Sequence, residues 1–248
     1  MNLENESALV SIVTLTKNNE SDLKKTINSV INQSYANIEY IISNGGEDLS
    51  VEIINLLESS KVKKISILEK QNKGIYPSMN YSLKFCSGKW INFMNAGDAF
   101  LNKDAIERAV EGQSDTPSIL LMRHEDNIFL QKFIKFKIYR NLCQQTIFYN
   151  SKKLGEIIYF DETFKYSADL ELLFRIHFFD KKYFVKNIRE SIIFYQPGGM
   201  SGQNTISLIN EKKNILTKHK RELNFLVWAV NMLFVNYVKL KLKFLGKI

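Results

Sequence analysis

Residues 9–15 read Leu-Val-Ser-Ile-Val-Thr-Leu, a run with the length and the β-branched composition of a buried strand. Residues 22–31 follow with apolar side chains three or four positions apart, which is the spacing of a helix. A second run of the strand type, residues 38–42, ends just before Asn44-Gly45-Gly46, whose composition is typical of a turn. This order of strand, helix and strand predicts a right-handed βαβ unit.

The same alternation continues as far as residue 98. The pattern predicts helices at 51–57 and 77–85 and strands at 64–68 and 90–94. We therefore expect an α/β fold with a Rossmann-like, mostly parallel sheet flanked by helices. Ligands of such sheets bind beyond the carboxyl ends of the strands. Four loops are thus candidates for a site, namely residues 16–19, 44–48, 70–76 and 95–98.

The alternation weakens after residue 112. The sequence predicts a loop at 113–117, a short strand at 119–122, a strand or hairpin at 128–139 and a helix at 166–179, and residues 192–195 lead into the turn Pro197-Gly198-Gly199. On this pattern we expect one large domain over residues 1–210. A basic and apolar helical tail is expected over residues 211–248.

The composition is that of a folded protein in a reducing compartment. Of the 248 residues 45% are hydrophobic and only 3 are Pro, which excludes a disordered or collagen-like chain. Cys86 and Cys143 are too few for a disulfide scaffold and fit no metal-ligand spacing. The polar, acidic segment Met1–Ser7 predicts no signal peptide, so we expect a cytoplasmic location. The net charge of +8 favours anionic partners.

Several segments occur in the order and at the spacing of one enzyme family. They are Val10–Asn18, Asn32–Tyr35, Asn37–Ile42 before Gly45-Gly46, Lys73–Tyr76, Met79-Asn80, Ser87–Asp98, Ser167–Asp169 and Gly198–Ser201. On these residues the chain resembles the glycosyltransferase family 2 enzymes of GT-A fold. In particular it is similar to the group that builds colanic acid, capsule and O-antigen. The resemblance extends from about residue 8 to about residue 202.

The resemblance implies an inverting glycosyltransferase. Its donor would be a nucleoside diphosphate sugar, with UDP favoured, and its acceptor a hydroxyl group of a lipid-linked oligosaccharide in cell-envelope polysaccharide synthesis. The donor-binding residues that it implies are Thr16, Lys17, Asn44, Gly45, Lys73, Gly74, Asn95 and Asp98. Asn44 stands where the family has an acidic residue, and Asn72 and Pro77 stand where it has aspartates. Asn can still bond a base or a ribose, although Asn44-Gly45-Gly46 could also form only a turn.

The segment Asn95-Ala96-Gly97-Asp98 takes the place of the family's Asp-x-Asp cluster, which holds a divalent cation. The resemblance therefore implies that Asp98 binds Mg²⁺ or Mn²⁺, with Asn95 as a neutral helper. One carboxylate suffices for Mg²⁺, because this ion keeps several waters and uses the phosphates of the substrate. The alternative is that Asp98 only caps the segment that follows it.

Asp169 matches the aspartate that family members place at the start of a helix beside the acceptor. The resemblance implies that it is the catalytic base, aimed at the acceptor hydroxyl. The alternative is a carboxylate that complements the helix dipole. On a helix, Glu171 should face elsewhere and Arg175 should be structural.

Other residues of the second half receive weaker assignments. Gly198–Ser201 is expected to form a loop that closes over the substrates, and Gln144 stands where relatives often have His. The three histidines, His124, His177 and His219, fall outside the motifs, and we assign them no role.

The tail contains sixteen uncharged residues, 223–238, followed by a Lys-rich end. This run is shorter than the roughly 20 apolar residues that span a bilayer. Together with the lysines, Trp228, Phe234 and Tyr237 predict a helix that lies on an anionic membrane surface. The alternative is a helix packed on the domain or on a partner subunit, with a homodimer left open.

A second class of function also fits the sequence. The departures from the family pattern could mark a degenerate GT-A domain that binds a nucleotide sugar or a partner glycosyltransferase without catalysis. A sugar nucleotidyltransferase is disfavoured, because no Gly-rich phosphate loop with paired Arg or Lys follows the first strand. Nucleic-acid binding is disfavoured as well, because the basic cluster lies on an apolar tail and not along a groove.

Overall fold

The computed structural model describes residues 7–69, 73–111, 117–124, 143–180, 184–188, 192–196, 205–223 and 225–244. The strand or hairpin predicted at 128–139, Asn72 and the predicted loop Gly198–Ser201 lie outside these ranges, as does most of the loop predicted at 113–117.

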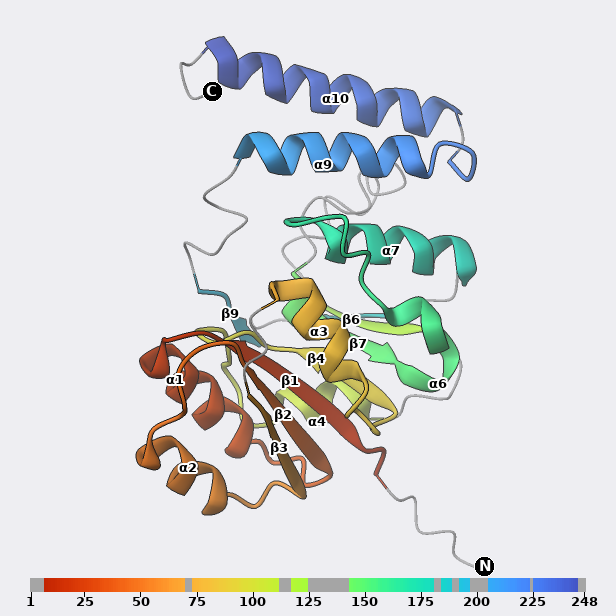
Figure 1. Cartoon of the computed structure of the whole chain (residues 1–248). Helices are drawn as coiled ribbons and strands as arrows, with labels where there is room; N and C mark the ends of the chain where they lie inside the picture. The colour runs from red at the N-terminus through yellow and green to blue at the C-terminus, as the bar shows by residue number, and fades with distance from the viewer. Residues whose placement is uncertain are drawn as a thin grey trace, which may run out of the picture.

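A seven-stranded sheet forms the centre of the molecule (Figure 1). Its order is β3 (Lys64–Leu68), β2 (Ile38–Asn44), β1 (Val10–Thr16), β4 (Trp90–Phe93), β7 (Ile147–Asn150), β6 (Ile119–His124) and β8 (Phe184–Ile188). β1 to β4 are mutually parallel, and β7 is antiparallel to both of its neighbours. The predicted α/β fold with a mostly parallel sheet is therefore confirmed.

Helices cover both faces of the sheet (Figure 1). The helices are α1 (Glu20–Ile31), α2 (Val51–Glu58), α3 (Ile75–Leu83), α4 (Ala105–Val110), α6 (Ser151–Leu154), α7 (Ala168–Phe179), α9 (Thr205–Lys218) and α10 (Phe225–Phe244), with 3₁₀ turns η2 (Gln144–Thr146) and η3 (Gly155–Ile158). Residues of α1, α2 and α4 pack on one face of the sheet. Residues of α3, α7 and α9 pack on the other face.

Local chemistry sets where the helices begin. The Asn19 side chain caps α1 by accepting a hydrogen bond from the Asp22 amide. Helix α3 begins two residues earlier than the sequence predicted, at Ile75, because Gly74 enters it with φ of +111°. Pro77 fits in the first turn, where amide groups have no partner within the helix.

A second, two-stranded sheet joins the two halves of the chain. β5 (Ala99–Phe100) pairs antiparallel with β9 (Ile193–Phe194). This pairing brings the residues after β9 to the loop that follows β4. It therefore places Gln196 beside Asp98.

The C-terminal helices α9 and α10 form a hairpin that stacks on α7 (Figure 1). The boundary expected at residue 210 falls within α9, and Ile215 and Leu216 of this helix belong to the main core. Within the described ranges, no helix combines the length and the apolar character that a membrane crossing needs.

Candidate functional site

The tips of β1 and β2 meet through their loops. Gly45 donates its amide hydrogen to the Thr16 carbonyl over 2.9 Å. Asn18, in the left-handed region with φ of 50°, accepts the Glu47 amide at Oδ1 over 2.8 Å. A Cβ at Gly46 would lie 2.0 Å from that oxygen and 2.6 Å from the Asn18 backbone nitrogen, so only glycine fits here. The structure thus brings Thr16, Lys17 and Gly45 together, with Lys17 exposed.

Asn44 is buried, and its side chain shapes this loop. Its Oδ1 accepts the Gly46 amide over 3.0 Å, and its Nδ2 donates to the Glu47 carbonyl over 2.6 Å. The same Nδ2 donates to Glu69 Oε2 over 2.9 Å, which joins the ends of β2 and β3. The turn that the sequence offered as an alternative is therefore present. Glu69 adds a carboxylate beside Asn44, the position where the family carries its acid.

Lys73 and Gly74 are exposed and precede α3. An added Cβ at Gly74 would find its nearest neighbour, Pro77 Cδ, at 3.7 Å, which is an ordinary contact. The positive φ is therefore what requires glycine at this position.

Asp98 is 3% exposed, and both of its carboxylate oxygens accept hydrogen bonds from the protein. Oδ1 accepts the Gln196 amide over 2.8 Å, and Oδ2 accepts Gln145 Nε2 over 2.5 Å. Burial raises the pKa of Asp98 above the usual range for Asp, although these two hydrogen bonds and the charge of Lys25 oppose that effect. Asp98 therefore holds together the loop after β4, the turn η2 and the residues after β9.

The loop after β4 also contains an unused oxygen. Asn95 Oδ1 is buried and has no hydrogen-bond partner. A cation bound there would find this oxygen and the remaining lone pairs of the Asp98 carboxylate, so the donor set fits a hard ion that takes most of its ligands from substrate and water. Among the residues that the structure describes, no three His, Cys, Asp or Glu side chains gather as a metal cluster.

Asp169 lies at the start of α7, as the sequence predicted, and is partly buried. Its Oδ1 accepts the Tyr76 hydroxyl over 3.2 Å and the Leu170 amide over 2.8 Å. Burial raises the pKa of the Asp169 carboxyl, and the hydrogen bonds from Leu170 and Tyr76 moderate this rise. A carboxylate in such a setting binds a proton more strongly than an exposed one.

Residues 143–146 connect the surroundings of the two aspartates. Gln145 contacts Asp98, while Gln144 Nε2 lies 3.8 Å from Met79 Sδ of α3, the helix whose Tyr76 contacts Asp169. Burial raises the pKa of the Cys143 thiol to about 11, and the charges of both Asp98 and Asp169 contribute to the rise. Through these contacts the two carboxylates belong to one connected region of the structure.

Two residues whose side chains contact these aspartates received no role from the sequence. Tyr76 stands within the recognised segment Lys73–Tyr76, and Gln145 follows Gln144. Their position in or beside family motifs was the only sequence signal for them. Their contacts with Asp169 and Asp98 became visible only in the structure.

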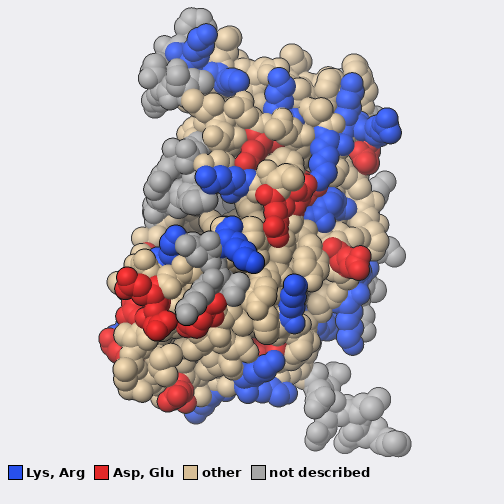
Figure 2. All heavy atoms as spheres, viewed as in Figure 1, with Lys and Arg blue, Asp and Glu red and all other residues tan. Residues whose placement is uncertain are grey.

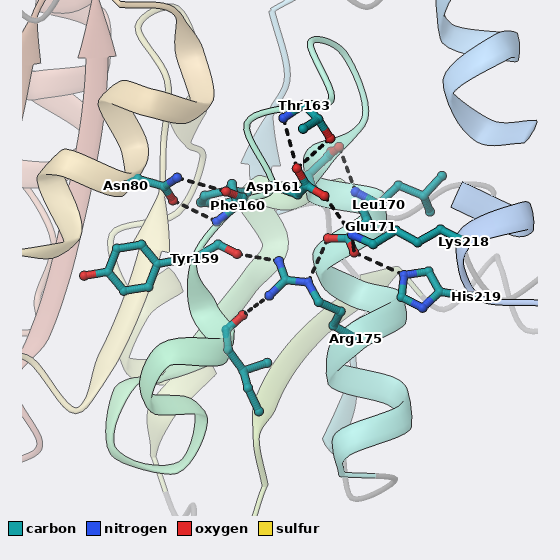
Figure 3. A network of polar contacts seen from close by, with 12 residues as sticks. Asn80, Tyr159, Phe160, Asp161, Thr163, Leu170, Glu171, Arg175, Lys218 and His219 are labelled. Atoms are coloured by element: carbon teal, nitrogen blue, oxygen red, sulfur yellow. Dashed lines mark hydrogen bonds and ion pairs between the residues drawn. The ribbon is translucent and has the colours of Figure 1, made fainter. Parts of the chain in front are cut away.

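Glu171 is fully buried, and its carboxylate lies among the side chains of Arg175, Lys218 and His219 (Figure 3). Its carboxylate accepts Arg175 Nε over 2.8 Å and Lys218 Nζ over 2.6 Å, and it lies 3.1 Å from His219 Nε2. Burial alone would raise the pKa of Glu171, but the hydrogen bonds from His219, Lys218 and Arg175 lower it to about 2. Arg175 is structural, as predicted. His219, to which the sequence gave no role, joins α9 to α7.

Comparison with known proteins identifies relatives at the level of sequence. The family model described as glycosyl transferase family 2 matches residues 11–168. A PGL/p-HBAD biosynthesis glycosyltransferase of Mycobacterium tuberculosis is 25% identical over 211 residues, which are 80% of each chain. An uncharacterized glycosyltransferase of Haemophilus influenzae is 27% identical over 243 residues, with 86% of this chain and 72% of the relative covered.

Solved structures share the fold at low sequence identity. TarS residues 1–349 from S. aureus, in complex with UDP-GlcNAc, superpose with a TM-score of 0.68 at 16% identity, covering 90% of this chain and 70% of that one. In another TarS crystal structure the matched region is 39% of the TarS chain. The mannosyltransferase PcManGT from Pyrobaculum calidifontis gives a TM-score of 0.69 at 12% identity, over 89% of this chain and 66% of that one. With a GT-A fold and a family match over more than half of its length, the chain belongs to glycosyl transferase family 2 and is a glycosyltransferase.

Proposed function

We propose that this glycosyltransferase moves a sugar from a nucleoside diphosphate, with uridine as the favoured base, to a hydroxyl group with inversion at the anomeric carbon. The observation that carries the proposal is that residues 143–146 connect the surroundings of Asp98 and Asp169, since Gln145 donates to Asp98 and Gln144 lies against Met79 of α3, the helix whose Tyr76 donates to Asp169. A site of this kind can hold a diphosphate on one side and an acceptor alcohol on the other. The TarS structures with UDP and UDP-GlcNAc support uridine as the base.

Asp169 is the base in this proposal. The acceptor oxygen forms a bond to the anomeric carbon while the bond from that carbon to the diphosphate oxygen breaks. The hydroxyl proton passes to the Asp169 carboxylate, and the nucleoside diphosphate leaves with the bonding electron pair. Because burial raises the pKa of Asp169, its carboxylate is a stronger base than an exposed aspartate would be.

In this proposal the nucleotide sugar is bound by Thr16, Lys17, Gly45, Lys73 and Gly74. Asn44 holds the loop after β2 in place through its hydrogen bonds to Gly46 and Glu47. The exposed ammonium groups of Lys17 and Lys73 meet the phosphates, and Gly45 and Gly74 permit close approach of the backbone.

Asp98 and Asn95 would hold Mg²⁺ or Mn²⁺. PcManGT was crystallised with GDP-Man and Mn²⁺, which supports a divalent ion in this fold. The ion would neutralise the charge that develops on the leaving diphosphate.

The acceptor in this proposal is a lipid-linked saccharide of the cell envelope, used at the cytoplasmic face of the membrane. The support comes from the relatives of M. tuberculosis and M. bovis, whose names place them in PGL/p-HBAD biosynthesis. Synthesis of O-antigen or capsule is the process that the family resemblance implies for this acceptor. The assay described next compares donor sugars.

Purified full-length protein is incubated with UDP-, GDP- and dTDP-sugars, with Mn²⁺ or with EDTA, and free nucleoside diphosphate is measured by chromatography. We expect release from a UDP-sugar that rises with Mn²⁺, is lost in Asp169→Asn and loses its Mn²⁺ dependence in Asp98→Ala. UDP binding by thermal shift without any turnover would contradict the proposal and support the non-catalytic alternative. Full activity of both variants would overturn the two assigned roles.

A further inference from the structure

An apolar stripe runs along the outer side of α10. Val230, Leu233, Tyr237 and Leu240 are 43%, 69%, 60% and 56% exposed. They recur at intervals of three, four and three residues, which places them on one face of the helix. At 1.5 Å per residue the stripe is about 15 Å long.

The opposite side of α10 already has a partner. Trp228, Met232 and Val235 pack against the core that includes Ile215 and Leu216 of α9. Figure 1 shows α10 as the outermost layer of the molecule, with α9 between it and α7. The stripe is therefore the outward face of a docked helix, and packing against the residues that the structure describes does not explain its exposed apolar side chains.

The charge around the stripe is strongly positive. Residues 205–244 contain eight cations, which are Lys212, Lys213, Lys218, Lys220, Arg221, Lys239, Lys241 and Lys243, against two anions, which are Glu211 and Glu222. Helix α10 itself carries no acidic residue. Figure 2 shows Lys and Arg side chains gathered at the end of the molecule where α9 and α10 lie. One charge of each sign is already engaged within the fold. Glu211 accepts the amides of Lys165 and Tyr166, and Lys218 pairs with Asp161 and Glu171.

We propose that this outer face of α10 docks on an anionic lipid surface, with the stripe in the interface and Lys241 and Lys243 among the headgroups. Lys239 is on the packed side of the helix, where it donates to Asn210 of α9. An apolar face bordered by lysines is the pattern of helices that lie in the plane of a membrane. A helix that is packed along one side and ends in three lysines lies on a bilayer and does not cross it. Contact with a second copy of the chain is less favourable, because the α10 helix of that copy brings three more lysines and no acidic residue to the contact.

The hairpin of α9 and α10 is connected through side-chain contacts to α7, the helix that carries the proposed base Asp169. Lys218 and His219, at the end of α9, contact Glu171 of α7, two residues from Asp169. Lipid contact through α10 therefore sets the orientation of α7 relative to the membrane. This orientation matters if the acceptor is lipid-linked, and that consequence rests on the proposed function. Lipid binding by α10 does not depend on the proposed function.

Vesicle co-sedimentation of the full chain tests the proposal without any sugar transfer. We expect binding to vesicles of phosphatidylcholine with phosphatidylglycerol, weak binding to phosphatidylcholine alone, and loss of binding as NaCl is raised. Replacing Lys241 and Lys243 together with Gln should weaken binding about thirtyfold at low salt. Leu233→Glu with Tyr237→Glu should weaken it at least about tenfold.

Val51→Glu is the matched control, because Val51 is an equally exposed apolar residue on α2, far from the hairpin in the fold. It should bind vesicles like the parent, and circular dichroism should show all variants folded. Equal binding to both vesicle types, or unchanged binding by the stripe variant, would overturn the proposal. The proposal would also be overturned if the protein did not bind vesicles but formed a dimer in light scattering that the stripe variant dissociates. The outer face of α10 would then contact a second copy of the chain.

Discussion

The Tyr76 hydroxyl donates a hydrogen bond to Asp169 Oδ1 over 3.2 Å, from the first turn of α3 to the first turn of α7. The Tyr76 ring is held in place by stacking on Phe160, with ring centroids 5.4 Å apart. This contact connects the loop that carries Lys73 and Gly74 to the proposed base. Tyr76 is therefore a positioning residue for Asp169.

Tyr76→Phe should lower kcat about tenfold at neutral pH while the KM for the donor stays unchanged. The hydrogen bond from Tyr76 lowers the pKa of Asp169, so its loss should raise that pKa further. Because the base works when deprotonated, the acid limb of the pH–rate profile should move to higher pH. Tyr81→Phe, on the more exposed side of α3, is the control. An acid limb that does not move would contradict the role given to Tyr76.

Asp169→Asn should lower kcat by a factor of about 10² to 10⁴, the usual contribution of a general base. The amide keeps the size of the side chain and can still accept the hydrogen bonds from Tyr76 and Leu170, so UDP affinity should not change. Initial rates and calorimetric titration with UDP separate the two effects. A variant that retains parental turnover would exclude Asp169 as the base.

Gln145→Leu should destabilise the fold by about 1 to 3 kcal/mol, because the buried Asp98 carboxylate loses the donor at Oδ2. It should also weaken Mn²⁺-dependent binding of the donor, since Asp98 is then less firmly held. Urea denaturation and UDP titration with and without Mn²⁺ measure these effects. Gln144→Leu is the control, because its side chain makes no contact with Asp98 in the structure. Equal stability of the two variants would show that the contact at Asp98 contributes little.

The first half of the fold could be predicted from the sequence because its signals are local. The strands β1 to β4 have runs of apolar and β-branched residues of strand length, and the structure places each within two residues of its predicted bounds. The parallel order follows from the alternation with helices, and it brings the ends of β1 and β2 to one edge. The same reasoning located the loops that contain Thr16 and Asn44.

Elements that depend on distant partners could not be predicted. α4 and β7 were missed, since β7 has only four residues and its order comes from antiparallel pairing with β4 and β6. The contacts of Asp98 with Gln145 and Gln196 join residues 47 and 98 positions apart. Such contacts follow from the tertiary fold, and no periodic pattern of residues in the sequence predicts them.

The contacts of Glu171 with Arg175, Lys218 and His219 make the attachment of the C-terminal hairpin dependent on pH. The pKa of Glu171 is about 2 in the folded protein, below the value of about 4.3 for a free Glu side chain. A lowered folded pKa adds stability above the unfolded pKa, and this stability is lost as the pH falls from about 4.3 towards 2. The difference corresponds to about 3 kcal/mol, which we reduce to about 2 kcal/mol because Lys218 is 42% exposed and screened by solvent.

Glu171→Gln should therefore cost about 2 kcal/mol at neutral pH and flatten the dependence of the unfolding free energy on pH below about 4.3. Arg175 and Lys218 would keep their charges beside a neutral amide, which is why the loss is expected at neutral pH and fades in acid. Urea denaturation at several pH values measures it, with exposed Glu58→Gln on α2 as the control. If both variants show the parental pH dependence, the carboxylate of Glu171 does not supply the acid-sensitive part of the stability.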